Sequence, residues 1–345
     1  MPEPATTPSA TELPVPTSVW VTAQQDARGQ RRGRYLDQSA THPAKMLPAV
    51  AAHAIAHYTQ PGDLVLDPLC GIGTSLVEAI HQGRDAVGVE YEPRWATIAA
   101  GNLEAATRQG ATGTANLHIA DARTLPGPLL PDLAGRVALV LTSPPYGQST
   151  HGHARTIPTG GVRKQHHRYG PGPDRGQLAN LSHPRLLAGL TRILIGCLPL
   201  LNPGGHIIIT ARPWREHGEL VDLPSEVITS GRAAGLLPIE RCAALLAGLR
   251  GNQLVLRASF FQRNLVHMAR ADGEPWHLIT HEDVLIFRAP DNPQRPTTPD
   301  AVGDTVAPPT AAPTRPSRQD QAHPHRRCRR RGIPASRPHR TGDAA

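Results

Sequence analysis

The sequence predicts an α/β fold in which a mostly parallel sheet carries helices on both faces. Short apolar runs rich in Val, Leu and Ile recur between residues 64 and 210, and such runs are typical of buried strands. Segments with apolar residues at helical spacing lie between these runs. This alternation favours a parallel sheet, because parallel neighbours need a crossover connection that is usually a helix. Ligands of such sheets bind where the strands end, near the point at which strand order reverses.

Length, charge and cysteine usage limit the class of protein. The chain has 345 residues and a formal net charge of +8, and a length of this size allows one large domain with tails. No apolar run is long enough to predict a transmembrane helix, and the N-terminus is proline-rich and acidic, unlike a signal peptide. The four cysteines have no paired spacing, so we expect reduced thiols in a cytoplasmic protein.

Both ends of the chain are predicted to be disordered, leaving one domain over residues 18–289. Residues 1–17 and 290–345 are rich in Pro and small polar residues and contain few large apolar side chains. Residues 290–345 hold ten Arg against five Asp, and residues 147–181 and 20–46 are also basic. Two interpretations stay open: these segments contact a nucleic acid, or Arg is simply abundant in this chain.

The first elements surround a glycine-containing loop. A helix over 49–56 follows the segment Thr41-His42-Pro43-Ala44-Lys45-Met46, and a buried strand over 64–66 comes next. The loop 67–74 then leads into a helix predicted over 75–82. Gly71 and Gly73 allow a tight turn and a close approach of the backbone to a ligand. The strand 86–89 ends at Glu90, about 20 residues past the glycines, where an acidic side chain commonly binds ribose hydroxyls.

Two further strands end on polar residues. The strand 117–120 follows a helix over 93–106 and ends at Asp121, which either faces a ligand or caps the next turn. The strand 137–141 ends in Thr142-Ser143-Pro144-Pro145-Tyr146-Gly147. The two prolines remove two backbone donors, so nearby carbonyls are free to face a pocket, where Ser143 offers a hydroxyl and Tyr146 a flat ring. A strand end of this kind suits a planar group that carries an amine.

The second half of the chain predicts the remaining elements. Residues 147–181 are a long basic stretch, interpreted as a flexible flap over the site; their histidines have irregular spacing, so no metal is expected. Helices are predicted over 182–197 and 224–234, with a turn over 200–205 before a strand over 206–210. Residues 257–261 and 283–288 are predicted to form a closing antiparallel pair, and residues 236–256 carry no clear pattern.

The glycine loop and the TSPPY segment together resemble the amino-methyltransferases that use S-adenosylmethionine. The resemblance covers roughly residues 40–290, and the TSPPY form is most similar to the cytosine-N4 branch of the DNA methyltransferases. It implies the Rossmann-like methyltransferase fold, a doubly wound, mostly parallel sheet of seven strands with an antiparallel last strand. It also implies a DNA substrate and a role in DNA methylation, including restriction-modification.

The resemblance assigns residues to two groups by position. The group implied to act on the target base is Ser143, Pro144, Pro145 and Tyr146. The group implied to bind S-adenosylmethionine is His42, Pro43, Asp67, Pro68, Cys70, Gly71, Gly73, Thr74, Glu90, Asp121 and Ala122. Within the second group, Asp121 is expected at the adenine amino group and the segment around His42 at the methionine end.

The family mechanism implies direct methyl transfer to the exocyclic amine of a flipped-out base. The Ser143 hydroxyl and the Pro144 carbonyl would accept the amine hydrogens while Tyr146 stacks on the base. Cytosine N4 is favoured over adenine N6 because Ser, not Asp or Asn, opens the motif. Two alternatives stay open: an RNA enzyme similar to the tRNA guanosine-N2 methyltransferases, and a binding protein without catalytic activity. The sequence does not indicate the oligomeric state.

Overall fold

The computed structural model describes residues 15–127, 129–146, 177–216 and 218–290, together with the backbone of 153–156 and 162–165. The tails predicted to be disordered lie outside the described residues, apart from 15–17 and 290. No helix in the described part of the chain is long and apolar enough to cross a membrane.

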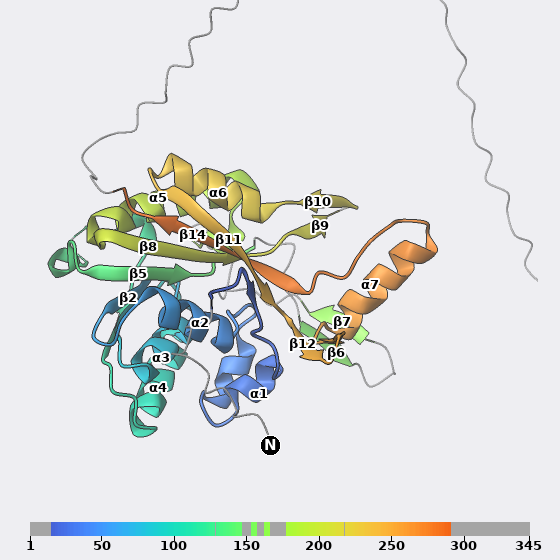
Figure 1. Ribbon diagram of the computed structural model, residues 1–345, viewed down its shortest axis with the longest axis horizontal. Coiled ribbons are helices and arrows are strands. Elements are labelled where there is room, and N and C mark those ends of the chain that lie inside the picture. The colour runs from blue at the N-terminus through green and yellow to red at the C-terminus, as the bar shows by residue number, and fades with distance from the viewer. Residues whose placement is uncertain are drawn as a thin grey trace, which may run out of the picture. The chain divides into compact units, whose positions relative to one another are not determined.

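An eight-stranded sheet forms the centre of the described domain, in the order β1-β11-β14-β8-β5-β2-β3-β4 (Figure 1). Its strands are β1 (Val19–Trp20), β2 (Leu64–Asp67), β3 (Asp85–Glu90), β4 (Ala115–Ile119), β5 (Val137–Thr142), β8 (Leu201–Ala211), β11 (Leu237–Leu245) and β14 (His281–Arg288). The remaining strands form three short hairpins: β6 (His153–Thr156) with β7 (Val162–Gln165), β9 (Trp214–Glu216) with β10 (Glu219–Val221), and β12 (Ala247–Arg250) with β13 (Gln253–Leu256).

The strand order confirms the prediction of a doubly wound, mostly parallel sheet with an antiparallel last strand. β14 runs antiparallel to both of its neighbours, β8 and β11, whereas the pairs β2–β3, β3–β4, β2–β5 and β5–β8 are parallel. The chain builds outward from β2 to β4 and then returns to place β5 on the other side of β2. The strand order therefore reverses between β2 and β5. The eighth strand, β1, is a two-residue addition at the edge that pairs with β11.

Helices cover both faces of the sheet, with α2, α3 and α4 on one face and α5 and α6 on the other (Figure 1). The helices are α1 (Ala27–Arg31), α2 (Pro48–Tyr58), α3 (Thr74–His81), α4 (Pro93–Arg108), α5 (His183–Cys197), α6 (Leu223–Ala233) and α7 (Phe260–Ala271). Short 3₁₀ turns occur at Asp37–Thr41, Ala122–Thr124, Pro131–Leu133, Leu178–Asn180 and Leu198–Leu200.

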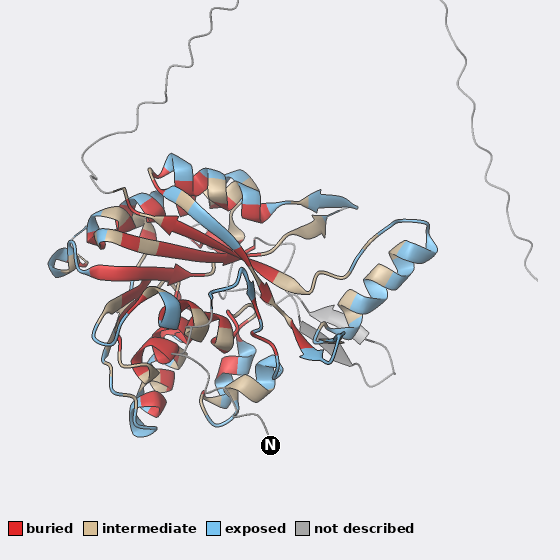
Figure 2. Cartoon of the chain, in the orientation of Figure 1, coloured by how far each residue is buried: buried red, intermediate tan, exposed pale blue. Residues whose placement is uncertain are grey.

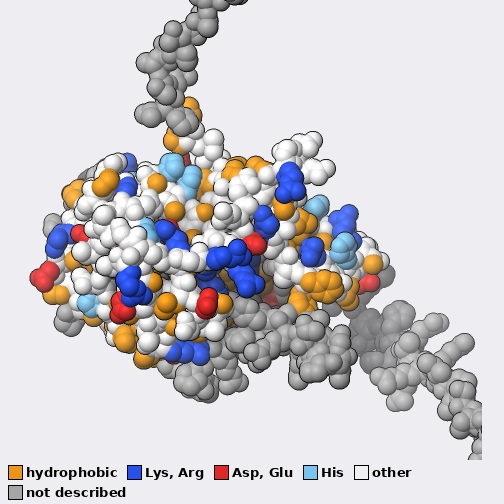
Figure 3. Space-filling view, turned by 90° about the horizontal axis from the view of Figure 1, so that it is seen from below, with side chains coloured by type: hydrophobic (Ala, Val, Ile, Leu, Met, Phe, Trp, Pro, Cys, Tyr) orange, Lys and Arg blue, Asp and Glu red, His pale blue; other side chains and the backbone are white. Residues whose placement is uncertain are grey.

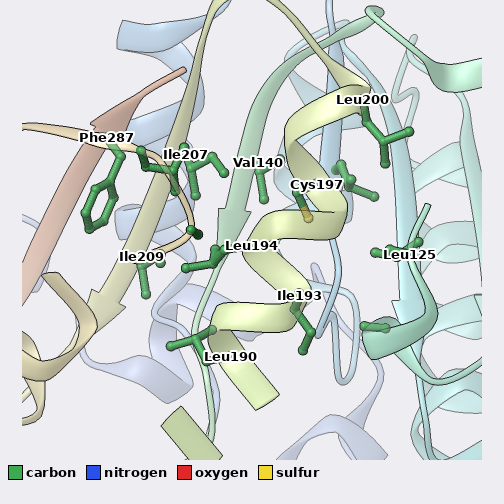
Figure 4. Packing of buried hydrophobic residues seen from close by; sticks show 14 of the residues in the cluster. Leu125, Val140, Leu190, Ile193, Leu194, Cys197, Leu200, Ile207, Ile209 and Phe287 are labelled. Atoms are coloured by element: carbon green, nitrogen blue, oxygen red, sulfur yellow. The ribbon is translucent and has the colours of Figure 1, made fainter. Parts of the chain in front are cut away.

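Alternate side chains of the central strands supply two hydrophobic cores. Val140 packs with α5 residues such as Ile193 and Leu194 (Figure 4). Leu139 and Leu141 join the other cluster, which is formed with α2 and α3. Buried residues fill the central strands in Figure 2. Every residue of β5 is buried, as expected for a parallel strand covered on both faces. The helices thus leave the strand ends, rather than the sheet faces, available to a ligand.

Two local predictions were wrong. Residues 257–261 do not form a strand: β14 pairs with β11 and β8, and Phe260 begins helix α7, which has no buried residue. The turn predicted over 200–205 belongs largely to β8, which starts at Leu201, and the expected turn is a register shift against β5. Within the basic stretch 147–181, the described backbone forms the hairpin β6–β7, and the interpretation of this stretch as a flexible flap stays a prediction. The rest of that stretch up to residue 176 lies outside the described residues.

Candidate active site

Two neighbouring cavities lie where the parallel strands end. The first has a volume of about 110 Å³ and the second about 330 Å³. Residues at or just after the ends of β2, β3, β4 and β5 line the first cavity, namely Asp67, Glu90, Asp121 and Ser143. This edge, next to the reversal in strand order, is the usual ligand-binding edge of a doubly wound sheet. The four polar strand-end residues predicted from the sequence therefore surround one cavity.

Asp67 joins the end of β2 to the start of α3. Its carboxylate accepts hydrogen bonds from the Ser75 hydroxyl and from the Leu69 backbone N–H, the latter at 3.0 Å. The side chain is almost fully buried, and burial raises the pKa of Asp67 to about 6 although both hydrogen bonds oppose the rise. Asp67 therefore fixes the conformation of the glycine loop and also lines the cavity that the loop borders.

The two glycines of the loop have different surroundings. Both have positive φ, +55° at Gly71 and +78° at Gly73. A Cβ at Gly71 would lie 3.2 Å from Nε2 of His42, which lines the first cavity. A Cβ at Gly73 would lie 3.2 Å from the Cβ of Ala99 on α4, and Gly73 does not line the cavity. Gly71 therefore belongs to the predicted site, whereas Gly73 permits close packing of the loop against α4.

Glu90 holds the glycine loop from the end of β3. Its Oε2 accepts a hydrogen bond from the Gly71 N–H and its Oε1 accepts one from the Glu92 N–H, each at 2.8 Å. Each oxygen retains a further lone pair that can accept a ligand hydroxyl. Burial raises the pKa of Glu90 to about 7, against the effect of these two hydrogen bonds.

Asp121 both caps a turn and faces a cavity, the two possibilities that the sequence left open. Its side chain caps the 3₁₀ turn Ala122–Thr124 by accepting from the Arg123 N–H, and it also lines the first cavity. The Arg123 guanidinium contacts both carboxylate oxygens, with a shortest N–O distance of 2.6 Å. Burial opposes ionisation of Asp121, but the contacts with Arg123 outweigh it and the pKa is lowered. The carboxylate is thus held charged and oriented beside the cavity.

The rest of the predicted cofactor group divides between the cavities. Pro68, Cys70, Thr74 and Ala122 line the first cavity, whereas Pro43 lines the second. Burial raises the pKa of the Cys70 thiol well above its usual value, so this thiol stays protonated and is a poor nucleophile. No group of three or more His, Cys, Asp or Glu in the described ranges could hold a metal, and His151, His153, His166 and His167 lie outside the residues whose side chains are described.

The second cavity meets the first at the TSPPY segment. Ala44, Lys45 and Ser143 line both cavities, while Pro144 and Pro145 line only the first and Tyr146 only the second. A ligand in the first cavity and a ligand in the second could therefore approach each other at Ser143. The TSPPY segment crosses the boundary between the two spaces.

Tyr146 forms part of the wall of the second cavity. The residue is 7% exposed, with the Arg212 guanidinium 5.7 Å from the ring centroid and the Trp214 ring centroid 6.2 Å away. Burial raises the pKa of Tyr146, so the phenol remains neutral. Arg212 and Trp214 follow β8, so they come to Tyr146 from a strand that neighbours β5 in the sheet.

Basic side chains predominate among the charged residues of the second cavity. Arg31, Lys45, Arg212 and Arg257 line it, against Asp26 and Glu282. Burial and the charge of Arg31 lower the pKa of Lys45 to about 8, and its ammonium donates to the His42 carbonyl at 2.6 Å. Figure 3 shows Lys and Arg side chains gathered near the centre of one face of the molecule. Such a surface attracts polyanions.

Several site residues were not predicted. Gln177, Leu178 and Ala179 close the first cavity from the segment before α5. Gln262 lines the second cavity from α7, and Glu282 lines it from the start of β14. The acidic pair Glu282-Asp283 at the start of an antiparallel last strand was a usable signal, because such a strand begins at the edge where its parallel neighbours end.

Comparison with known protein families finds a match in the first third of the chain. Residues 4–101 match the family model described as DNA methylase. The match contains the segment around His42, the glycine loop and Glu90, and it ends before the TSPPY segment.

Curated relatives are similar over segments of comparable length. The chain is 34% identical over 90 residues to the type II methyltransferase M.ScaI of Streptomyces caespitosus, covering 26% of this chain and 29% of the relative. It is 33% identical over 81 residues to the DNA adenine methyltransferase YhdJ of Escherichia coli K12, covering 23% of this chain and 28% of the relative. The matched segments thus span less than a third of either relative.

Among solved structures, TrmN from Thermus thermophilus is similar with a TM-score of 0.43 and 18% identity, over 75% of this chain and 53% of that one.

Proposed function

We propose that this chain, whose resemblance to the DNA amino-methyltransferases is confirmed by the family match over residues 4–101, methylates the exocyclic amine of a DNA base with S-adenosylmethionine. The observation that carries the proposal is the junction of two cavities at Ser143. A methyl donor in the first cavity and a base in the second would meet at the residue that opens the motif. Acting on cellular DNA, such an enzyme would work in the cytoplasm.

The charges of the first cavity support S-adenosylmethionine as the cofactor. Asp67, Glu90 and Asp121 line it, and Lys45 is the one Lys or Arg among the described lining residues. Three carboxylates suit a ligand that carries hydroxyls, amino groups and a sulfonium charge. They would repel the pyrophosphate of a dinucleotide, which other sheets of this kind bind at a helix N-terminus. Glu90 would accept the ribose hydroxyls, and Asp121 would accept the adenine amine.

When bound, S-adenosylmethionine would supply a methyl group on a positively charged sulfur, with a thioether as the leaving group. The target amine must give up a proton, and its lone pair is delocalised into the ring. The Ser143 hydroxyl oxygen and the Pro144 carbonyl oxygen would accept hydrogen bonds from the two N–H groups of the amine. These hydrogen bonds would direct the lone pair toward the first cavity. The proton then passes to solvent. The contribution of the protein is positioning and local electrostatics, both of which lower the barrier in a closed site.

The second cavity supports a flipped-out base. Tyr146 lines it and offers a neutral aromatic wall for stacking. The four basic residues around it would contact the phosphates on either side of the extruded nucleotide. Ser143 at the head of the motif favours cytosine N4 as the target, while the relative YhdJ is by its name an adenine methyltransferase. Cytosine N4 is therefore proposed first and adenine N6 second.

Nucleoside mass spectrometry after reaction with S-adenosylmethionine tests the proposal. Plasmid DNA from a host without amino-methylation and total RNA are incubated separately with the wild type, with Ser143→Ala and without protein. The proposal expects N4-methylcytosine in the DNA, formed by the wild type and reduced at least a hundredfold with Ser143→Ala. N6-methyladenine would keep the enzyme class and change the base. N2-methylguanosine in the RNA alone, or no methylated product, would overturn the proposal.

A further inference from the structure

One acidic side chain in the second cavity has no structural partner to explain its burial. Glu282 is the second residue of β14 and is 9% exposed. Its Oε2 is buried and forms no hydrogen bond with any described residue. A buried carboxyl without a partner is costly to the fold, so its retention among the lining residues of a cavity points to a ligand. Because β14 is antiparallel, Glu282 lies at the same edge as the ends of β5 and β8.

The charged groups around Glu282 leave its carboxyl unneutralised. Arg212 is the cation whose charge acts on it, yet no ion pair within 4.0 Å joins the two in the described part of the chain. The neighbouring Asp283 is engaged elsewhere, since its Oδ1 accepts from Arg241 at 2.7 Å and its Oδ2 lies 3.8 Å from His281. Tyr146 lines the same cavity, and the charge of Glu282 helps to raise the pKa of its phenol. The other titratable lining residues are Asp26, Arg31, Lys45 and Arg257.

Burial has the largest influence on the ionisation of Glu282. It raises the pKa of the carboxyl; Arg212 opposes the rise and Asp283 adds to it. The neutral acid is therefore favoured to a higher pH than for an exposed glutamate. A neutral carboxyl has one O–H donor and one carbonyl acceptor side by side, whereas a carboxylate can only accept.

The O–H donor matches one edge of two bases and not of a third. In cytosine the amine N4 lies beside the ring acceptor N3, and in adenine N6 lies beside the acceptor N1. On the Watson–Crick edge of guanine, the amine N2 lies beside N1–H, which is a donor. A neutral carboxyl can donate to the ring acceptor of cytosine or adenine, which leaves both amine hydrogens for Ser143 and Pro144. Guanine offers a donor at the corresponding ring position and cannot take this hydrogen bond.

We propose that Glu282 is a base-reading residue, which donates a hydrogen bond to the ring nitrogen beside the target amine and so positions that amine toward Ser143. The proposal rests on the proposed function, because it needs a base in the second cavity. Glu282 does not take part in the bond changes. It selects bases that have a ring acceptor next to the amine. It also orients the amine, which donates hydrogen bonds to Ser143 and Pro144.

The test compares Glu282→Gln with Glu282→Ala in methyl transfer from labelled S-adenosylmethionine to unmodified plasmid DNA. The Gln side chain has the same length as Glu, keeps one hydrogen-bond donor and one acceptor, and does not ionise. The Ala side chain has no donor and no acceptor. We expect Glu282→Ala to lower kcat/KM about tenfold to a hundredfold, and Glu282→Gln to retain most of the activity. Glu104→Gln, an exposed side chain on α4, is the matched control for loss of a carboxylate.

The pH profile separates reading of the base from a structural role. In the wild type kcat/KM should fall as pH rises and Glu282 ionises, whereas Glu282→Gln should lack that fall. Lys45 titrates in both proteins and cancels in the comparison. Equal loss in the Gln and Ala variants, or identical pH profiles for Gln and the wild type, would overturn the proposal. A wild type that methylates no nucleic acid would overturn the proposed function itself, so the two failures can be told apart.

A base analogue supplies a readout that protein stability cannot affect. Once sequencing of modified DNA locates the target, an oligonucleotide is made with the ring nitrogen beside the amine replaced by C–H. The wild type should lose the same tenfold to hundredfold on this substrate, and Glu282→Ala should treat the two oligonucleotides alike. An equal loss in both proteins would show that another group reads the ring nitrogen.

Discussion

Replacement of Gly71 by Ala tests the cofactor loop most sharply, because the structure offers a matched control. Gly71 has a φ of +55°, and its new Cβ would lie 3.2 Å from Nε2 of His42. Gly62, in the turn before β2, has a φ of +88° and no atom within 4 Å of a new Cβ. Both substitutions place a side chain in the left-handed region, at a cost of about 1–2 kcal/mol. Only Gly71→Ala also displaces a residue of the first cavity.

The two variants should therefore differ in ligand affinity more than in stability. We expect each to lose about 1–2 kcal/mol of unfolding free energy in urea titrations. Gly71→Ala should displace His42 and also the Gly71 N–H, which donates to Glu90. We therefore expect its affinity for S-adenosylhomocysteine, measured by isothermal titration calorimetry, to fall at least tenfold. Gly62→Ala should bind as the wild type does. Equal affinity in Gly71→Ala and Gly62→Ala would show that the glycine loop does not contact the cofactor.

Two further predictions concern single side chains. The folded-state pKa of Glu90 is raised to about 7, above its ordinary value near 4.5, so its contribution to stability is complete below pH 4.5 and is lost as pH rises through 7. Urea titrations of the ligand-free protein should show up to about 3 kcal/mol of this loss, and a wild-type stability that does not fall between pH 5 and 7.5 would contradict the assigned environment. Tyr146→Ala should abolish methyl transfer while leaving S-adenosylhomocysteine affinity unchanged, because Tyr146 lines the second cavity alone. Transfer at the wild-type rate would remove the stacking role, and Tyr58→Ala, outside both cavities, is its control.

The part of the fold and site that the sequence predicted is the part built from continuous chain segments. Apolar runs located β2, β3, β4 and β5, and each run carried its polar residue directly after it, so Asp67, Glu90, Asp121 and Ser143 could be placed together. These residues share one edge because the strands are parallel, and the alternation of strands and helices indicated a parallel sheet. Local burial patterns were therefore sufficient.

The second cavity could not be assembled in this way, because its walls come from segments far apart in the sequence. Arg212 and Arg257 come from segments far along the chain from Tyr146, and Glu282 joins the cavity only after the antiparallel last strand is inserted beside β8. Gly73 packs against α4 and does not line the first cavity, and a glycine required for helix packing looks the same in sequence as one required for a ligand.

Helix α7 was missed although a local signal was available. The side chain of Ser259 accepts from the Gln262 N–H, and the Gln262 side chain accepts from the Ser259 N–H, which is a capping box. The pair Phe260-Phe261 favours a strand by propensity, and this preference masked the start of the helix. The Ser-x-x-Gln spacing would have placed the helix correctly.

The central claim is that the methyl donor and the base amine meet at Ser143, and a single-turnover rate measures it most directly. Labelled S-adenosylmethionine and unmodified DNA are supplied to Ser143→Ala at concentrations that saturate both cavities. The account predicts that both ligands bind as in the wild type and that the transfer rate falls at least a hundredfold, about 3 kcal/mol of activation free energy. A transfer rate equal to that of the wild type would place the chemistry somewhere other than this junction.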